Sequence, residues 1–383
     1  MTKLIYIANM RLPTEKAHGL EVVKLCEAFA KIGIETWLFL PFSVNPTKGD
    51  PFAFYRAEKI FKIKKLPALD LLFLGIFPNF FFLLRSLCFS KCVLVYFFFK
   101  KLQGKLRDTV FFSHDHIPLY FISFLNIPFV FDIHDFPSGN FLYRRVLKKA
   151  LGFGVQTKWK IQELGRRFGI PENKIVYWPN GVEIKEFAID INQKEARKKL
   201  DLPLDKKIVL YTGHFFSWKG TDTLALASAY LDNDTLVYFV GGAPEDTEKF
   251  KTFVVEKRLD KIRLVSFRPH EEIPIWLKAA DVLVLPNTAK EDISKFYTSP
   301  MKMFEYMAAG RPIVASDLPS ITEILNQNNS VLVEPDNPEG LAKGIKFILS
   351  DNNFAEKINQ QAYLDVQKYT WIERTRLIKD FSF

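Results

Sequence analysis

The segment from Ser299 to Pro312 reads SPMKMFEYMAAGRP and predicts both ends of a helix. Ser299 is a good N-cap, and Pro300 suits the first helical position, where a missing backbone N–H costs nothing. Gly310, followed by Pro312, ends the helix.

Lys302 does not fit the charge preference of a helix N-terminus. It puts a cation in the first turn, at the positive end of the helix macrodipole, where an acidic residue would be favoured. A bound anion, held by Lys302 and by free backbone N–H groups such as that of Met301, would resolve the conflict. Glu305 lies three residues on, on the same face, as an acceptor for ligand hydroxyls. Phosphate at one end and a polyol at the other indicate a nucleotide sugar as the ligand.

Length and composition indicate two globular domains. The chain has 383 residues, of which 48% are hydrophobic and 25% charged, and 38 are phenylalanine. Met1-Thr2-Lys3 leads directly into an apolar, strand-like run, without the pattern of a secretory signal. The three cysteines, Cys26, Cys88 and Cys92, are odd in number and indicate reduced thiols in a cytoplasmic protein.

The net charge of +10 belongs to the first half of the chain. Residues 1–185 contain 27 Lys+Arg and 14 Asp+Glu, whereas residues 186–383 contain 26 and 29. A basic first half attracts anionic partners, namely membrane headgroups, a phosphorylated acceptor or nucleic acid. A solvated surface is the alternative for any single basic cluster.

The most apolar region runs from Leu66 to Phe99. Its longest uncharged stretch, Leu71–Leu84, has 14 residues and contains Pro78-Asn79, whereas a membrane span needs about 20 residues. We therefore expect no transmembrane helix. Two alternatives stay open, a buried hairpin of helices or a patch that dips Phe80–Leu83 into the surface of a bilayer.

Short apolar runs alternate with amphipathic stretches along the whole chain, which indicates parallel α/β architecture. A helix is expected over 19–31, because Val22, Leu25, Cys26 and Phe29 form one apolar stripe. The strands expected are Leu4–Ala8, Glu35–Leu40, Val110–Ser113, Phe129–Ile133, Gly152–Gln156, Ile208–Thr212, Leu236–Val240, Ile262–Val265, Val282–Leu285, Ile313–Ala315 and Val331–Val333. Two doubly wound, Rossmann-like domains facing a central cleft follow from this series. We expect them to be 1–185, with a crossover helix over 369–383, and 186–368.

Several blocks of sequence, taken in order, resemble those of retaining glycosyltransferases of the GT-B fold, family 4 (the glycosyl transferases group 1). The blocks are Ala17-His18-Gly19-Leu20-Glu21, Asp132-Ile133-His134-Asp135, Pro179-Asn180-Gly181-Val182, Tyr211-Thr212-Gly213-His214, Lys219-Gly220, Val240-Gly241-Gly242, Arg268-Pro269-His270, Ala280-Asp281-Val282 and Ser299–Glu305. The resemblance covers essentially the whole chain and is strongest in its second half.

The resemblance implies a donor-binding role for the second domain. Lys219, with Gly213 and His214, is expected at the donor pyrophosphate beside Ser299, Met301 and Lys302, although the family usually has Arg or Lys where His214 stands. Glu305 is implied to bind the ribose hydroxyls, and Arg268 and Pro269 to receive the nucleobase. A structural ion pair is the alternative for Arg268.

The resemblance also implies which residues meet the transferred sugar. The family has a pair of acids with seven residues between them, and Glu305 matches the second of the pair. At the position of the first, this chain has Tyr297, and Glu291 and Asp292 are candidate substitutes. His134, at the end of an expected strand, is implied to contact the sugar. His18 and Gly19 are expected in a loop beside the cleft, where a glycine permits close approach.

The function predicted is retaining transfer of a sugar from a nucleotide-diphosphate sugar to a saccharide or lipid-linked anionic acceptor of the cell envelope. His134, Lys219 and Glu305 are the expected catalytic residues, and no cofactor, metal or nucleic acid is expected to take part. We expect a cytoplasmic protein that lies at the inner face of the plasma membrane. A nucleotide-sugar epimerase or phosphorylase on the same fold, or a non-catalytic nucleotide-sugar-binding subunit, are the alternatives.

Overall fold

The computed structural model describes residues 2–382 and divides into two compact units. The first contains the chain up to Pro179 together with the last segment from Trp371, and the second contains Asn180–Thr370. The first unit thus ends a few residues before the boundary expected at 185. The closing segment that returns to it begins at Trp371, whereas the sequence placed its start at 369.

The first unit is a seven-stranded parallel sheet in the order β3-β2-β1-β4-β5-β6-β7. Its strands are β1 Lys3–Ile7, β2 Glu35–Pro41, β3 Lys62–Leu66, β4 Thr109–Ser113, β5 Phe129–Ile133, β6 Gly152–Val155 and β7 Ile175–Tyr177. Its helices are α1 Ala17–Lys31, α2 Pro51–Phe54, α3 Pro78–Leu102, α4 His116–Ile122, α5 Phe141–Lys149, α6 Lys158–Phe168 and α16 Trp371–Ser382. This strand order turns back at β1 and β4, as in doubly wound dinucleotide-binding folds.

Phenylalanine fills much of the core of the first unit. Phe111, Phe129 and Phe131 on neighbouring strands are buried and pack against Phe89 and Phe97 of α3. Strands buried on both faces by helices have continuous apolar runs, which explains why these segments show no alternation with polar residues.

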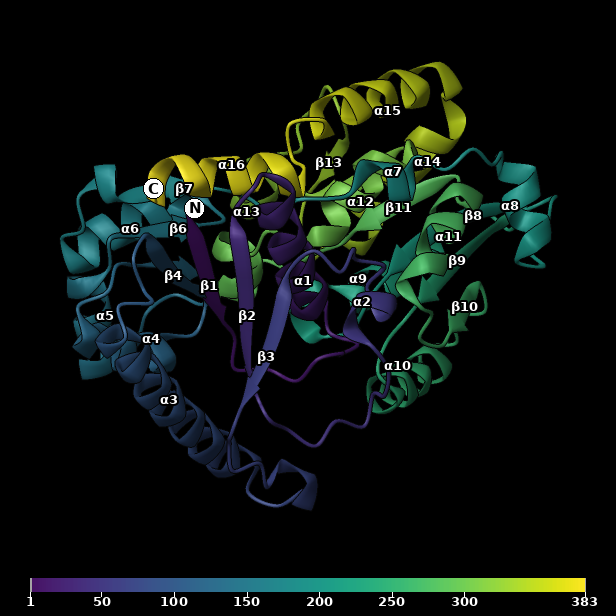
Figure 1. Cartoon of the computed structure of the whole chain (residues 1–383). Coiled ribbons are helices and arrows are strands. Elements are labelled where there is room, and N and C mark those ends of the chain that lie inside the picture. The colour runs from purple at the N-terminus through teal and green to yellow at the C-terminus, as the bar shows by residue number, and fades with distance from the viewer. Residues whose placement is uncertain (1, 383) are drawn as a thin grey trace. The chain divides into compact units, whose positions relative to one another are not determined.

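Helix α16, drawn in yellow, lies along β6 and β7 of the first unit (Figure 1). Two glycines of β6 make room for large rings. A Cβ on Gly152 would lie 2.0 Å from Phe381 of α16, and a Cβ on Gly154 would lie 1.5 Å from Trp178. The last turns of the chain are therefore part of the first unit's packing.

The second unit is a six-stranded parallel sheet in the order β10-β9-β8-β11-β12-β13, which repeats the doubly wound pattern. Its strands are β8 Lys207–Thr212, β9 Thr235–Val240, β10 Ile262–Val265, β11 Val282–Leu285, β12 Ile313–Ser316 and β13 Val331–Val333. Its helices are α7 Ile184–Phe187, α8 Gln193–Lys199, α9 Thr221–Ala227, α10 Pro244–Glu256, α11 Ile273–Ala279, α12 Met301–Ala309, α13 Pro319–Thr322, α14 Pro338–Ser350 and α15 Asn352–Val366. All six strands expected in this half are confirmed.

Three expectations about the first unit and its helices need correction. Strands β3 and β7 were not predicted, because the lysine-rich sequence of β3 and the three residues of β7 give little apolar signal. The region around Phe80 is not a hairpin of helices but one helix, α3, of 25 residues. Among the residues described, α3 is also the helix long and apolar enough to cross a membrane by length and composition. The length argument against a span was wrong, because the helix continues through Arg85 and Lys91.

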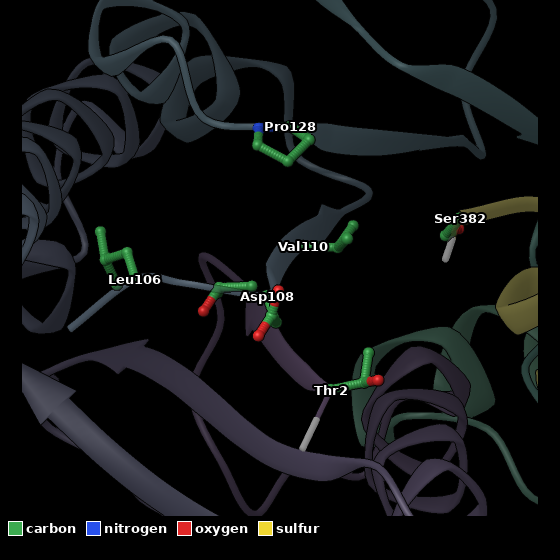
Figure 2. Close-up of a pocket in the computed structure, with 7 residues that line it drawn as sticks. Thr2, Leu106, Asp108, Val110, Pro128 and Ser382 are labelled. Atoms are coloured by element: carbon green, nitrogen blue, oxygen red, sulfur yellow. The ribbon is translucent and has the colours of Figure 1, made fainter. Parts of the chain in front are cut away.

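A pocket of about 430 Å³ lies at the end of the first sheet where strands β1 and β4 begin. Thr2, Asp108 and Thr109 line it together with Ser382 of α16 (Figure 2). Ligands of doubly wound sheets bind at the opposite edge, beyond the carboxyl ends of the strands. None of the site residues expected from the sequence lines this pocket.

Candidate functional site

The candidate donor site of the second unit begins at the carboxyl end of β8. The chain continues from Thr212 into Gly213, whose φ of +117° favours glycine. A Cβ at Gly213 would lie 2.9 Å from the Nζ atom of Lys302. The glycine thus leaves the space that the lysine ammonium occupies.

Lys302, in the first turn of α12, is 8% exposed. Its ammonium donates a hydrogen bond to the carbonyl oxygen of Thr212 and lies 3.6 Å from the ring centroid of Tyr211. Burial and the nearby charge of Lys219 lower the pKa of Lys302 well below its ordinary value, and the carboxylate of Glu305 offsets them only in part. The folded state therefore disfavours the charged form of Lys302.

Lys219 lies directly before α9, and Gly220 follows it as the N-cap of that helix. Gly220 has a φ of +64°, and a Cβ there would lie 2.0 Å from the carbonyl oxygen of Pro286. Only glycine allows the chain to pass so close to the β11 end. Burial lowers the pKa of Lys219 to about 8, against the opposing effect of the Glu305 carboxylate.

Glu305 is buried on α12 and completes the cluster. Its Oε1 atom lies 3.1 Å from Nε2 of His270. The charges of Lys219 and Lys302 both interact with this one carboxylate, and they also repel each other. Two ammonium groups, one buried and one half-buried, that interact with a single carboxylate form a site with excess positive charge, which suits an anion.

The start of α12 differs from the sequence expectation. The helix begins at Met301 with Pro300 at the N-cap, and Ser299 does not cap it. Instead the backbone N–H of Asn180 donates to the Ser299 hydroxyl at 3.2 Å, and the Asn180 side chain donates to the Ser299 carbonyl at 2.7 Å. Ser299 therefore fixes the Asn180 turn, while Met301 occupies the first helical position. The expected end of the helix, at Gly310, is confirmed.

The contacts that the structure describes for His214 and Arg268 are with Tyr211, Phe216 and Glu272 rather than with the two lysines. The Tyr211 hydroxyl donates to the His214 carbonyl at 2.7 Å, and the His214 ring stacks on Phe216 at 5.1 Å. Arg268 is exposed, with Nε 4.0 Å from a carboxylate oxygen of Glu272, which is the ion pair that the sequence left as the alternative.

Pro269 is the residue before the short turn His270–Glu272, so it helps to set the position of His270 beside Glu305. Sequence reasoning did not single out His270 as a site residue. The sequence feature that could have indicated His270 is the Arg268-Pro269-His270 block, of which only Arg268 and Pro269 were predicted to lie in the site.

Tyr297 ends a π-helical turn, Ile293–Tyr297, that precedes α12. Of the two acids considered as its substitutes, Glu291 accepts a hydrogen bond from the Ser217 hydroxyl at 2.7 Å, and Asp292 is exposed. Glu291 therefore ties the segment before α12 to the turn that carries Lys219.

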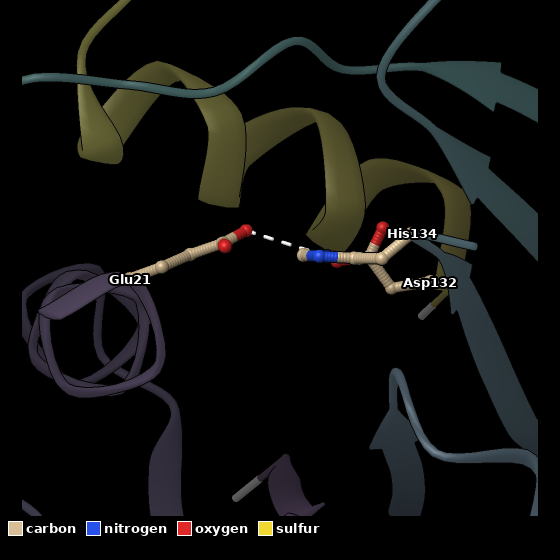
Figure 3. A group of neighbouring side chains, drawn as sticks. All are labelled: Glu21, Asp132 and His134. Carbon is tan, nitrogen blue, oxygen red and sulfur yellow. Dashed lines mark hydrogen bonds and ion pairs between the residues drawn. The ribbon is translucent and has the colours of Figure 1, made fainter. Parts of the chain in front are cut away.

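In the first unit, His134 follows β5 directly, as expected. Its Nε2 atom lies 3.0 Å from Oδ2 of Asp132 and 3.4 Å from Oε1 of Glu21 (Figure 3). Although burial acts in the opposite direction, the two carboxylates raise the pKa of His134 above its ordinary value. The His134 carbonyl accepts a hydrogen bond from the ammonium of Lys160 at 2.7 Å.

Asp132 is fully buried at the centre of a polar network. Its Oδ1 atom accepts from Gln156 at 2.5 Å and from the Trp178 indole at 2.9 Å. The ion pairs with His134 and with Arg374 of α16 hold the pKa of this carboxyl well below its usual range, although burial would raise it. Sequence reasoning missed Arg374, because nothing in the local sequence marks a residue so far along the chain as a partner of Asp132.

His18 and Gly19 lie in the first turn of α1, not in a loop as expected. A Cβ at Gly19 would lie 2.3 Å from the Tyr55 hydroxyl and 2.5 Å from Thr14, so the glycine makes room for protein side chains rather than for a ligand. Burial and the neighbouring His114 lower the pKa of His18 to about 4, which keeps its ring neutral near pH 7.

Glu21, Asp132 and His134 also offer ligand atoms within 4.8 Å of one another, close enough to share a metal ion. The guanidinium of Arg374, however, lies 2.7 Å from Glu21 and 3.0 Å from Asp132. This guanidinium already supplies the cation that the two carboxylates need, and a metal ion would have to displace it.

Comparison with known proteins shows which proteins the chain resembles. Residues 192–365 match the family described as glycosyl transferases group 1. An uncharacterized glycosyltransferase of Methanocaldococcus jannaschii is 29% identical over 218 residues, which are 55% of this chain and 54% of that protein. A putative teichuronic acid biosynthesis glycosyltransferase of Bacillus subtilis, TuaC, is 23% identical over 254 residues, or 63% and 60% of the two proteins. The chain thus spans little more than half the length of the curated relatives it matches.

The solved structures extend the likeness to the whole chain. The structure of HepE from Anabaena in complex with UDP has a TM-score of 0.74 and 16% identity, and the alignment covers 99% of each chain. At this identity the likeness shows the fold. The match over residues 192–365 and the shared GT-B fold agree with the similarity to the glycosyl transferases group 1 that the sequence blocks indicated.

Proposed function

We propose that the protein is a retaining glycosyltransferase that moves a sugar from a nucleotide-diphosphate sugar to a saccharide or lipid-linked acceptor of the cell envelope. The pair formed by the half-buried Lys219 and the buried Lys302 in the second unit is the observation that carries this proposal. Lys219 and Lys302 repel each other and share one carboxylate, so the site gains most from a ligand with two adjacent negative charges. A diphosphate is such a ligand.

The remaining groups of the cluster suit the rest of a nucleotide. Glu305 presents carboxylate oxygens beside Lys219 and Lys302, where ribose hydroxyls can donate to them. His270, 3.1 Å from Glu305, fixes the orientation of that carboxylate. Support also comes from HepE, the fold neighbour whose structure contains UDP.

The role of the two lysines in the reaction follows from the negative charge that develops on the departing diphosphate. As the bond between the sugar C1 and the phosphate oxygen breaks, negative charge grows on the diphosphate, and the two ammonium groups stabilise it. The acceptor oxygen forms its bond to C1 on the same face, and its proton passes to the departing phosphate oxygen. No protein general base is required, and the lysines do the work that a metal ion would otherwise do. His134, on the first unit, is assigned to the transferred sugar.

The acceptor belongs to the cell envelope in this proposal. The relative from Bacillus subtilis is described as a teichuronic acid biosynthesis enzyme, and the first half of this chain has 27 basic against 14 acidic residues. A basic acceptor domain suits an anionic, lipid-linked saccharide. The protein would then work in the cytoplasm, at the inner face of the plasma membrane.

Thermal-shift screening of the full chain against UDP, GDP, ADP and CMP sugars tests the donor class. A bound nucleotide raises the unfolding temperature progressively with the logarithm of its concentration. The preferred donor is then incubated with candidate acceptors in the presence of EDTA, and the anomeric configuration of the product is read by NMR. We expect transfer with retention; inversion, or a requirement for added metal, would contradict the mechanism.

The same donor incubated without acceptor separates the alternatives. A transferase leaves the donor largely intact. Free nucleotide with an epimerised sugar would indicate an epimerase, and binding without turnover on any acceptor would indicate a non-catalytic subunit.

A further inference from the structure

Thr212, the last residue of strand β8, is bonded to helix α12 through two side chains that lie one helical turn apart. Its backbone N–H donates to the Tyr306 hydroxyl at 2.9 Å, and its carbonyl oxygen accepts a hydrogen bond from the ammonium of Lys302. The Tyr306 hydroxyl also lies 3.1 Å from the Thr212 hydroxyl, and either group can donate. Both backbone groups of Thr212 therefore bond to the helix that carries the candidate diphosphate lysine.

These contacts take the place of a neighbouring strand. Strand β11 pairs with β8 at Val209 and Leu210, and Thr212 lies beyond that register. A buried backbone N–H without an acceptor costs free energy, so the end of β8 needs a partner from outside the sheet. On its other side, the N–H of Gly213 donates to the carbonyl of Val240 at 2.8 Å. The chain at the end of β8 is thus held on both sides.

Tyr306 is fully buried, and its ring packs in the apolar core of the second unit. Burial raises the pKa of Tyr306 above its ordinary value, so the hydroxyl stays protonated near pH 7. A phenylalanine would fill the same apolar space. What the hydroxyl adds is the pair of contacts with Thr212, and core packing does not account for it.

The link from Tyr306 to Lys302 runs through the Thr212 carbonyl. An ammonium group has three donors, so Lys302 can keep one on this carbonyl and present two to a bound phosphate. The lysine stem is flexible, and a fixed acceptor is what selects one position for its charge. The position of the Thr212 carbonyl therefore decides where the Lys302 ammonium meets a ligand.

We propose that Tyr306 is a positioning residue of the donor site, which fixes the Thr212 carbonyl and through it the ammonium of Lys302. The binding of a diphosphate by Lys302 rests on the proposed function, whereas the hold of Tyr306 on Lys302 is a property of the empty protein. A group that is already fixed loses less rotamer freedom when the ligand arrives, so the site binds more tightly.

A double-mutant cycle tests the role of Tyr306 in binding. Isothermal titration at pH 7 with UDP, or with the nucleotide that the thermal-shift screen selects, compares wild type, Tyr306→Phe, Lys302→Met and the double variant. Tyr306→Phe should weaken binding about 3- to 10-fold when Lys302 is present. It should have no further effect in the Lys302→Met protein, because the two residues act as one unit.

Tyr55→Phe is the matched control. The Tyr55 hydroxyl accepts from the Thr14 N–H at 2.7 Å and donates to the Thr14 carbonyl at 2.8 Å, which is the same kind of contact in the first unit. Both substitutions should lower the unfolding temperature, but Tyr55→Phe should bind nucleotide like wild type. Wild-type affinity in Tyr306→Phe, or the same weakening with and without Lys302, would overturn the proposal.

Lysine labelling of the empty protein separates this proposal from the proposed function. Acetylation by acetic anhydride, read by peptide mass spectrometry, should be about 3- to 10-fold faster at Lys302 in Tyr306→Phe than in wild type, and unchanged there in Tyr55→Phe. Unchanged labelling in Tyr306→Phe would overturn the positioning role even if the protein binds nucleotide. A wild type that binds no nucleotide would refute the proposed function, and the labelling would still decide whether Tyr306 holds Lys302.

Discussion

Arg374 donates a hydrogen bond to Glu21 at 2.7 Å, although 353 positions separate the two residues in the chain. The same guanidinium lies 3.0 Å from Asp132, and all three side chains are buried. The last helix, α16, is thus tied to α1 and to the end of β5 by charge as well as by packing. Because Asp132 also contacts His134, the C-terminal helix supports the residue that is assigned to the sugar.

Replacing Arg374 by methionine should destabilise the first unit severely. The substitution keeps much of the side-chain volume but leaves the buried carboxylates of Glu21 and Asp132 without their guanidinium partner, at a cost of about 3–5 kcal/mol. Arg376→Met is the control, since Arg376 is exposed and pairs with the exposed Glu373, and its loss should cost about 0–1 kcal/mol. Urea unfolding of the full chain measures both. Equal effects of the two substitutions would show that the buried network does not hold α16.

Nucleotide affinity should fall as the pH rises above about 8. Burial lowers the pKa of Lys219 to about 8 in the empty protein, and only the protonated form attracts a diphosphate. The phosphate groups of UDP are already ionised above pH 7, so the two lysines should set the slope, each by up to about tenfold in Kd per pH unit. Calorimetric titrations with UDP from pH 6.5 to 9.5 measure this dependence. An affinity that stays constant through pH 9.5 would place the diphosphate away from Lys219.

Lys302→Met should leave the empty protein as stable as wild type, or make it more stable. The pKa of Lys302 is lowered well below its ordinary value, so the folded state disfavours the ammonium, and this penalty is largest at low pH and disappears as the lysine loses its proton. A stability gain combined with loss of nucleotide binding is the behaviour of a functional residue. Thermal unfolding without ligand at pH 6 and pH 9 checks it. A marked loss of stability at pH 6 would instead make Lys302 a structural residue.

Gly213→Ala should weaken nucleotide binding by displacing Lys302, because the new Cβ would lie 2.9 Å from the lysine Nζ. Gly49→Ala is a matched control for backbone strain, since Gly49 has a φ of +123°, close to the +117° of Gly213, and open space around it. We expect similar losses of stability from the two substitutions but a loss of UDP affinity only from the first. Isothermal titration of both variants gives the comparison, and equal UDP affinities would contradict the role given to Gly213.

Much of the fold was predictable, because apolar strand runs and helix-ending glycines act locally. Every strand expected in the second unit was found, and Gly310 ended its helix as expected. Strand β3 was missed because its lysines belong to an edge strand, where charge prevents unwanted pairing and hides the apolar pattern. The extent of α3 was misjudged because Pro78 begins that helix rather than interrupting it.

The site was predictable in part. Lys302 and Glu305 share one helix, so their spacing was readable from the sequence, and Lys219 was marked by the glycine after it. Arg374 and His270 were not assigned, because their partners come from distant parts of the chain and only the folded structure brings them together. Ser299 was assigned to the wrong partner, since its hydroxyl bonds to Asn180 and not to the helix.

Binding of UDP, or of whichever nucleotide stabilises the protein most, tests the central claim most directly. Isothermal titration at pH 7 compares wild type with Lys219→Met and Lys302→Met. Lys343→Met serves as the control, because Lys343 is exposed on α14 and pairs with Glu339 of the same helix. Loss of a charged hydrogen bond worth about 1.5–3 kcal/mol should weaken binding roughly 10- to 150-fold in each test variant and leave the control unchanged. Wild-type affinity in both test variants would contradict the claim that this lysine pair holds a diphosphate.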